Sequence, residues 1–238
     1  MILSGQTVQR YDSVQRIYHW VNLGALLVLL WTGLTIYDLN IFGTRPFSAF
    51  AAALIGDVFT PLMFGLHRYA AFALLGGLII HIIYDTGIKG IFWSELPSKA
   101  DLRAQNILAK NFLGISKEYV KFPKFNIGQK MLHIGFAIVI VLIGATGFMM
   151  SANYRFLVPI WWLPLDFDFI LFWARVAHDV LTFVLITLVV MHFYFGVRRE
   201  NIPTFKSMLS GKVPKEYHEK HFSSSEEPEI IPAPKEEE

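Results

Sequence analysis

The chain has 238 residues, of which 54% are hydrophobic, and its mean hydropathy of +0.44 is too high for an ordinary soluble domain. The formal net charge of +2 is too small to indicate a nucleic-acid partner, and no basic stretch is interleaved with aromatic residues as in a single-strand binder. The chain contains no cysteine, which excludes disulfides, thiolate metal sites, iron–sulfur clusters and covalently attached c-type haem.

Four segments are long and apolar enough to cross a bilayer, which takes about 20 residues. The first begins too late and is too long for a cleavable signal, so we expect it to be retained. The predicted fold class is an all-α membrane protein, a four-transmembrane-helix bundle. We expect a cytoplasmic N-terminus at 1–16, a membrane domain at 17–222 and spans over residues 17–37, 67–86, 131–151 and 174–196.

Two other apolar stretches carry residues that a lipid-facing helix tolerates poorly. Residues 47–66 contain Asp57 and Pro61, and residues 156–173 contain prolines and aspartates among three tryptophans. Tryptophan is enriched at the headgroup level. We therefore expect both stretches to be interfacial segments.

Basic residues are distributed unevenly between the connecting segments. The loop at 87–130 has eight lysines and arginines and the chain from 197 has seven, whereas the other two loops have one each. The positive-inside rule then puts both termini in the cytoplasm, with the chain as a multi-pass membrane protein. The acidic tail at 223–238 is expected to be disordered, either as a partner contact or as a solvated end. No internal repeat of fixed period is evident.

Histidines recur at one spacing in two of the apolar segments. His67 and His81 are fourteen residues apart, and so are His178 and His192. Fourteen residues make nearly four helical turns and rise about 21 Å, so each pair lies on one helix face at two depths. An imidazole in hydrocarbon needs a partner, and haem iron is a common one.

The predicted topology assigns these histidines to two levels. The second and fourth spans run in the same direction, so His67 and His178 share the outer level, and His81 and His192 share the inner level. His19 and His133 begin their spans on the inside. Six histidines thus compete for the four ligand places of two bis-histidine haems, and any of them could instead be a packing residue.

Several stretches together resemble one known family. The chain contains RIYHWVNLGALLVLLWTGL in its first span, FNIGQK before an apolar run that ends in ATGFMM, and SMLSGKVPKEYHEKHF after its last span. Over residues 10–222 it resembles the membrane cytochrome b (gamma) subunit of respiratory formate dehydrogenases. The cytochrome b subunits of nickel–iron hydrogenases share the same plan and are the main alternative.

The resemblance implies a location in the bacterial cytoplasmic (inner) membrane and two non-covalent b-type haems. It assigns His67 and His178 to the outer haem iron, and His19 and His192 to the inner one. The presence of His81 is a departure from the family pattern. By depth alone His81 could replace His19, or it could contact a haem propionate or merely pack.

The resemblance also implies a quinone or menaquinone site beside the inner haem. Its residues would be Asn126, Gly128 and Gln129, with His133 nearby. An amide can hydrogen-bond a quinone carbonyl, and a glycine permits close approach. Asn126 could equally serve as the N-cap of the third span.

Three arginines lie close to candidate ligands and could pair with haem propionates: Arg16, Arg68 and Arg175. Positive-inside anchoring already explains the first, and interfacial snorkelling explains the other two.

The predicted function is electron transfer from a periplasmic-side oxidoreductase across the bilayer to quinone. Without cysteines the chain needs an iron–sulfur subunit and a catalytic oxidoreductase subunit as partners, and substrate oxidation belongs to those chains. One alternative of a different class is a haem-free proton-relay transporter, for which Asp85 and Asp179 would be the acidic candidates. The other is a structural anchor, which needs no paired histidines.

Overall fold

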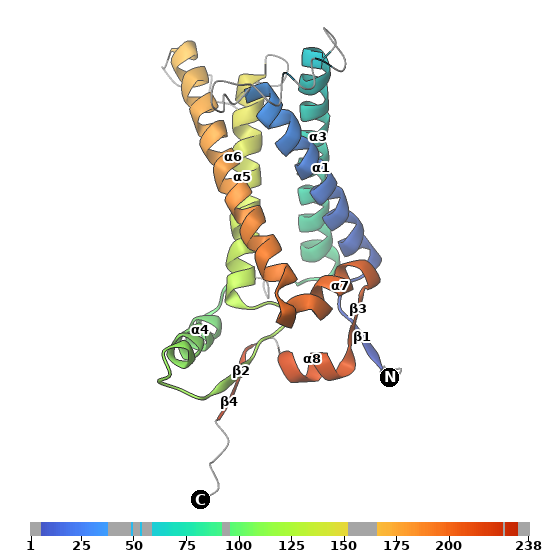
Figure 1. Ribbon diagram of the computed structural model, residues 1–238, viewed down its shortest axis with the longest axis vertical. Helices are drawn as coiled ribbons and strands as arrows, with labels where there is room; N and C mark the ends of the chain where they lie inside the picture. Colours follow the sequence, from blue (N-terminus) through green and yellow to red (C-terminus); the bar gives the residue numbers. More distant parts are fainter. Residues whose placement is uncertain are drawn as a thin grey trace, which may run out of the picture. The chain divides into compact units, whose positions relative to one another are not determined.

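The structure is a computed structural model that describes residues 6–37, 49, 53, 59–91, 96–151, 166–225 and 227–232. Within these residues four helices are long and apolar enough to span a membrane (Figure 1). They are α1 (Ser13–Tyr37), α3 (Phe59–Ile82) with its π-helical continuation η2 (Ile83–Ile88), α5 (Ile127–Met150) and α6 (Phe167–Val197). The predicted all-α, four-span fold class is confirmed.

Large apolar side chains cover the outside of these helices. Leu27, Ile138 and Val190 are each more than half exposed, at 57%, 53% and 61%. A soluble protein rarely shows contiguous apolar surface of this kind, whereas lipid covers it without cost. The chain is therefore an integral membrane protein.

Two of the helices begin earlier than the sequence analysis predicted. The second starts at Phe59 rather than at residue 67, because Pro61 falls in the first turn, where a proline removes no helical hydrogen bond. The fourth starts at Phe167 rather than at residue 174. There the carboxylate of Asp166 caps the helix by accepting from the backbone N–H groups of Asp168 and Phe169. The two helices therefore include residues 59–66 and 167–173 of the stretches expected to be interfacial, and most of the remainder of those stretches lies outside the described residues.

The chain divides into two compact units. Residues 13–84 form one unit, which consists of the paired helices α1 and α3. The other unit contains the pair α5 and α6 together with the shorter elements. Each pair is antiparallel, because the second half of one helix contacts the first half of the next: Thr32 contacts His67, and Thr146 contacts His178.

The second unit also holds a layer of short elements outside the membrane helices. Its helices are α4 (Lys99–Phe112), η5 (Arg199–Asn201), α7 (Ile202–Ser210) and α8 (Lys215–His221), and its strands are β1 (Thr7–Gln9), β2 (Tyr119–Lys121), β3 (Lys212–Pro214) and β4 (Glu229–Ile231). Strand β1 pairs with β3 in antiparallel register, with Val8 opposite Val213 (Figure 1). The segments before the first span and after the last span therefore lie together on one membrane face.

The acidic tail is partly ordered, which corrects the expectation of disorder for residues 223–238. Strand β4 pairs with β2 in antiparallel register, and Val120 lies opposite Ile230. The two isoleucines of β4 supply the branched apolar side chains that favour a strand. Pairing with β2 also satisfies backbone groups that a free tail would leave to water.

Candidate functional site

His67 lies on α3 and contacts the second half of α1. Its Nδ1 is 2.9 Å from Thr32 Oγ1, and Thr32 is fully buried. The hydroxyl of Thr32 also donates to the Val28 carbonyl at 2.7 Å. The next residue, Gly33, lies against the imidazole, and a Cβ there would make an ordinary contact at 3.4 Å with the His67 Cε1 atom.

His178 on α6 has the same surroundings in the second helix pair. Its Nδ1 is 2.9 Å from Thr146 Oγ1, and that hydroxyl donates to the Ile143 carbonyl at 2.9 Å. A Cβ on Gly147 would lie 3.4 Å from the His178 Cε1 atom. The two predicted outer ligands therefore lie in matching local structures within separate helix pairs.

The match extends along the sequence of both pairs. A histidine, twelve residues and then Thr-Gly occur in α1, from His19 to Gly33, and again in α5, from His133 to Gly147. Helices α3 and α6 each carry two histidines fourteen residues apart. The second spacing was predicted from the sequence and the first was not, so neither threonine was given a role. The pattern His-x12-Thr-Gly was the signal that could have revealed them.

The remaining histidines gather at the opposite end of each pair. In the first unit, the ring centroids of Tyr18 and His81 are 4.9 Å apart, so His81 lies at the same end as His19, the neighbour of Tyr18. In the second unit, the Phe136 and His192 rings meet edge-on at 5.8 Å. Each helix pair therefore carries histidines at two levels along its length.

The predicted quinone residues form the beginning of α5. Asn126 is the N-cap, and its side-chain oxygen accepts from the Gln129 backbone N–H at 2.9 Å. The Gln129 side-chain oxygen accepts from the Asn126 backbone N–H at 3.0 Å, which completes a capping box and confirms the predicted N-cap. His133 follows Gln129 by four residues and so shares its helix face. Gly128 has a local role, since a Cβ there would lie 3.3 Å from the Asn126 side-chain oxygen.

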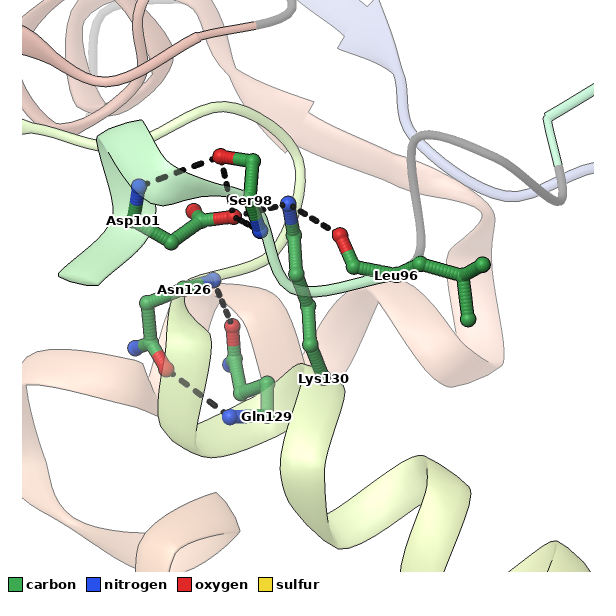
Figure 2. A network of polar contacts seen from close by, with 6 residues as sticks. All are labelled: Leu96, Ser98, Asp101, Asn126, Gln129 and Lys130. Carbon is green, nitrogen blue, oxygen red and sulfur yellow. Dashed lines mark hydrogen bonds and ion pairs between the residues drawn. The ribbon is translucent and has the colours of Figure 1, made fainter.

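A buried ion pair lies beside this cap (Figure 2). Lys130 Nζ is 2.8 Å from Asp101 Oδ2, and their side chains are 3% and 0% exposed. Asp101 Oδ2 also accepts from the Ser98 backbone N–H and hydroxyl at 2.8 and 2.9 Å. Burial by itself raises the pKa of Asp101, but the hydrogen bonds from Lys130 and Ser98 outweigh burial and lower the pKa below its ordinary value. This network joins α4 to the first turn of α5.

The three candidate propionate partners differ in their positions. Arg16 lies in the first turn of α1 and donates to the Ser13 hydroxyl at 3.2 Å. Because α3 and α6 begin earlier than predicted, Arg68 and Arg175 lie well inside their helices rather than at the starts. Both side chains are exposed on their helices.

The described residues contain no group of three or more histidine, aspartate or glutamate side chains that could hold a metal ion. A bis-histidine haem needs only two axial imidazoles, because the porphyrin supplies the other four ligands. His67 and His178 each offer a positioned imidazole with a glycine against the ring. This donor set fits a haem iron rather than an isolated metal ion.

A family model described as prokaryotic cytochrome b561 matches residues 10–211, which is most of the chain and includes all four membrane helices. No curated protein matches the chain.

Proposed function

The chain belongs to the prokaryotic cytochrome b561 family, and from this premise we propose that it is a dihaem electron-transfer subunit that passes electrons across the membrane to quinone. Membership identifies it as a membrane cytochrome b of a haem b-binding family. The proposal adds the number of haems, their ligands, the quinone and the partner proteins.

The observation that carries the proposal is the matching environment of His67 and His178. Each imidazole has a threonine hydroxyl 2.9 Å from Nδ1 and a glycine against its ring. A helix pair that held its histidine only for packing would have no reason to reproduce this arrangement in the other pair. We assign these two residues to one haem, on the outer side of the membrane.

For the inner haem we propose His19 and His192 as ligands. A second possibility is His81 with His192. The matching sequence patterns of the two helix pairs favour it, because these two residues occupy equivalent positions on α3 and α6. The family resemblance of the RIYHW stretch supports His19. The experiment below separates the two possibilities.

A b-type haem supplies one-electron chemistry when it is bound. His67 and His178 would hold one haem and His192 would help to hold the other, and a haem held by two imidazoles would pass electrons rather than bind oxygen. At the beginning of α5, the cap uses the side-chain oxygens of Asn126 and Gln129, and their NH2 groups remain the donors suited to a quinone carbonyl. His133, four residues further along the helix, could deliver a proton to a reduced quinone at this end. Arg16, Arg68 and Arg175 are the proposed partners of haem propionates.

The electron donor is proposed to be a formate dehydrogenase-like complex, with an iron–sulfur subunit and a catalytic subunit outside the cytoplasmic membrane. The stretches shared with the formate dehydrogenase gamma subunit support this choice, and a nickel–iron hydrogenase is the alternative. The chain has no cysteine with which to build an iron–sulfur relay of its own. With both termini in the cytoplasm, the quinone end of α5 would face the cytoplasm and take protons from it.

Single His→Ala variants of the full chain test the ligand assignment by the haem content of the purified protein. We expect His67→Ala and His178→Ala to lose the same haem and to keep the other. Loss of the inner haem in His19→Ala but not in His81→Ala supports the first ligand pair, and the reverse result supports the second. If both variants at the outer level keep two haems, the ligand assignment is wrong. Co-purification from native membranes then identifies the partner enzyme.

A further inference from the structure

We infer that Thr32 and Thr146 are positioning residues for the haem ligands: each hydroxyl accepts the Nδ1–H of its histidine and thereby holds Nε2, with its lone pair, for the iron. This inference rests on the proposed function, since it takes His67 and His178 to be axial ligands. It concerns the neighbours of the ligands rather than the ligands themselves.

The direction of the hydrogen bond follows from the single hydrogen of a hydroxyl group. Thr32 Oγ1 has a backbone carbonyl, that of Val28, at 2.7 Å. A carbonyl can only accept, so the threonine hydrogen points to it and the oxygen presents its lone pairs to His67 Nδ1 at 2.9 Å. The Nδ1 atom must then carry the proton. In that tautomer Nε2 is unprotonated, which is the form that binds a metal.

The second pair leads to the same tautomer. Thr146 Oγ1 lies 2.9 Å from the Ile143 carbonyl and 3.1 Å from that of Leu142, and its oxygen lies 2.9 Å from His178 Nδ1. The two geometries were reached on separate helix pairs with different surrounding sequences. Their agreement argues against an incidental contact.

The glycine that follows each threonine completes the arrangement. At Gly33 and at Gly147 a Cβ would lie 3.4 Å from the Cε1 atom of the imidazole, which is the closest ordinary contact, and 3.9 Å from Nδ1. A larger side chain would push the ring off the hydroxyl. The threonine hydroxyl therefore holds the ring, and the glycine beside it leaves room for a side chain no larger than a methyl group.

A hydrogen bond to the remote nitrogen makes a metal-bound imidazole a stronger electron donor, and loss of such a partner typically weakens metal binding about 10–100-fold. A stronger donor stabilises ferric over ferrous iron. Removal of the hydroxyl should therefore raise the midpoint potential of the outer haem. A tenfold change in the preference for ferric iron corresponds to about 59 mV for one electron.

The test compares purified, haem-loaded full chains that carry Thr32→Val, Thr146→Val or both. Valine keeps the shape of threonine and removes the hydroxyl. The readouts are a spectroelectrochemical titration of each haem and the low-temperature EPR spectrum, whose g values report the orientation of the axial imidazoles. We expect the outer haem alone to shift to higher potential with altered g values, more in the double variant, while Thr32→Ser and Thr146→Ser restore the wild-type values.

Thr35→Val is the matched control in the first unit. Thr35 is 4% exposed, lies on the same helix and donates to the Trp31 carbonyl at 2.8 Å, as Thr32 does to the Val28 carbonyl. Thr187→Val serves in the second unit, where the hydroxyl donates to the Phe183 carbonyl at 2.9 Å. Neither control should move either potential.

The outcomes separate the inference from the proposed function. Unchanged potentials and g values in the double valine variant overturn the inference, and so do equal shifts in the controls. A valine variant that loses haem supports the inference only if its serine counterpart regains it, and overturns it otherwise. A wild-type chain that binds no haem overturns the proposed function itself.

Discussion

The buried ion pair between Lys130 and Asp101 allows a quantitative prediction for the substitution Lys130→Met. Methionine keeps most of the length of the side chain and removes its charge. Asp101 would remain fully buried, with the Ser98 backbone N–H and hydroxyl as its remaining donors. The variant therefore contains a carboxylate that is buried and no longer paired with a cation.

The size of the effect follows from the burial of the two side chains. An exposed ion pair contributes about 0–1 kcal/mol, whereas removal of one partner of a buried pair costs about 3–5 kcal/mol. With exposures of 3% and 0%, this pair belongs to the buried class. Because two hydrogen bonds from Ser98 remain, we expect the substitution to destabilise the fold by about 3 kcal/mol.

Hydrogen exchange of the α4 backbone amides in detergent or nanodiscs measures this loss locally. A cost of about 3 kcal/mol should accelerate exchange in residues 99–112 by about a hundredfold or more. The matched control is Lys89→Met, because Lys89 pairs with Asp12 at 2.9 Å but the side chains are 41% and 26% exposed. That substitution should accelerate exchange of the same α4 amides less than about tenfold.

The pH dependence supplies a second check with a defined sign. In the wild type the pKa of Asp101 is lowered, so its contribution is present above about pH 3.9, the unfolded value, and is lost as pH falls through the folded pKa. In Lys130→Met the lysine no longer lowers the pKa of Asp101, so this pKa is higher than in the wild type, and the difference in stability between variant and wild type shrinks as pH falls. Equal exchange in the two lysine variants at neutral pH would refute the reasoning.

Two further substitutions test the packing of the helix pairs. Gly33→Leu should displace the His67 ring and lower the content of the outer haem. Gly33→Ala, whose Cβ would lie 3.4 Å from the ring, should keep the wild-type haem content. Normal haem content in the leucine variant would contradict the close approach of Gly33 to the ring. A Cβ on Gly77 would overlap the side-chain amide of Asn22, so Gly77→Ala should lower the melting temperature, and the added substitution Asn22→Ala should recover part of the loss. A double variant no more stable than Gly77→Ala alone would argue against that contact.

Much of the fold follows from the hydrophobic pattern of the sequence. The four spans were predictable because each requires an uninterrupted apolar stretch, and the Asn126 cap was predictable from its place before such a stretch. The early starts of α3 and α6 were missed because Pro61 and Asp166 were taken as reasons against a helix. At a helix start, the same residue types are favourable.

The site was predictable where histidines share a helix and less so where neighbours lie on another helix. The spacing of His178 and His192 fixes their face and depth from helix geometry alone. The contact between Thr146 and His178 joins two helices whose register depends on tertiary packing, so the pattern His-x12-Thr-Gly could point to Thr146 but not to its histidine partner. The strand β4 was missed for the same reason, since its partner β2 lies more than a hundred residues earlier.

The central claim is that paired imidazoles hold two b-type haems within this chain. The most direct measurement is a pyridine haemochrome assay on the purified full chain, combined with a protein determination and a dithionite-reduced spectrum. The account predicts two b-type haems per chain. A preparation without haem, from cells that supply it to other b-type cytochromes, would contradict the account.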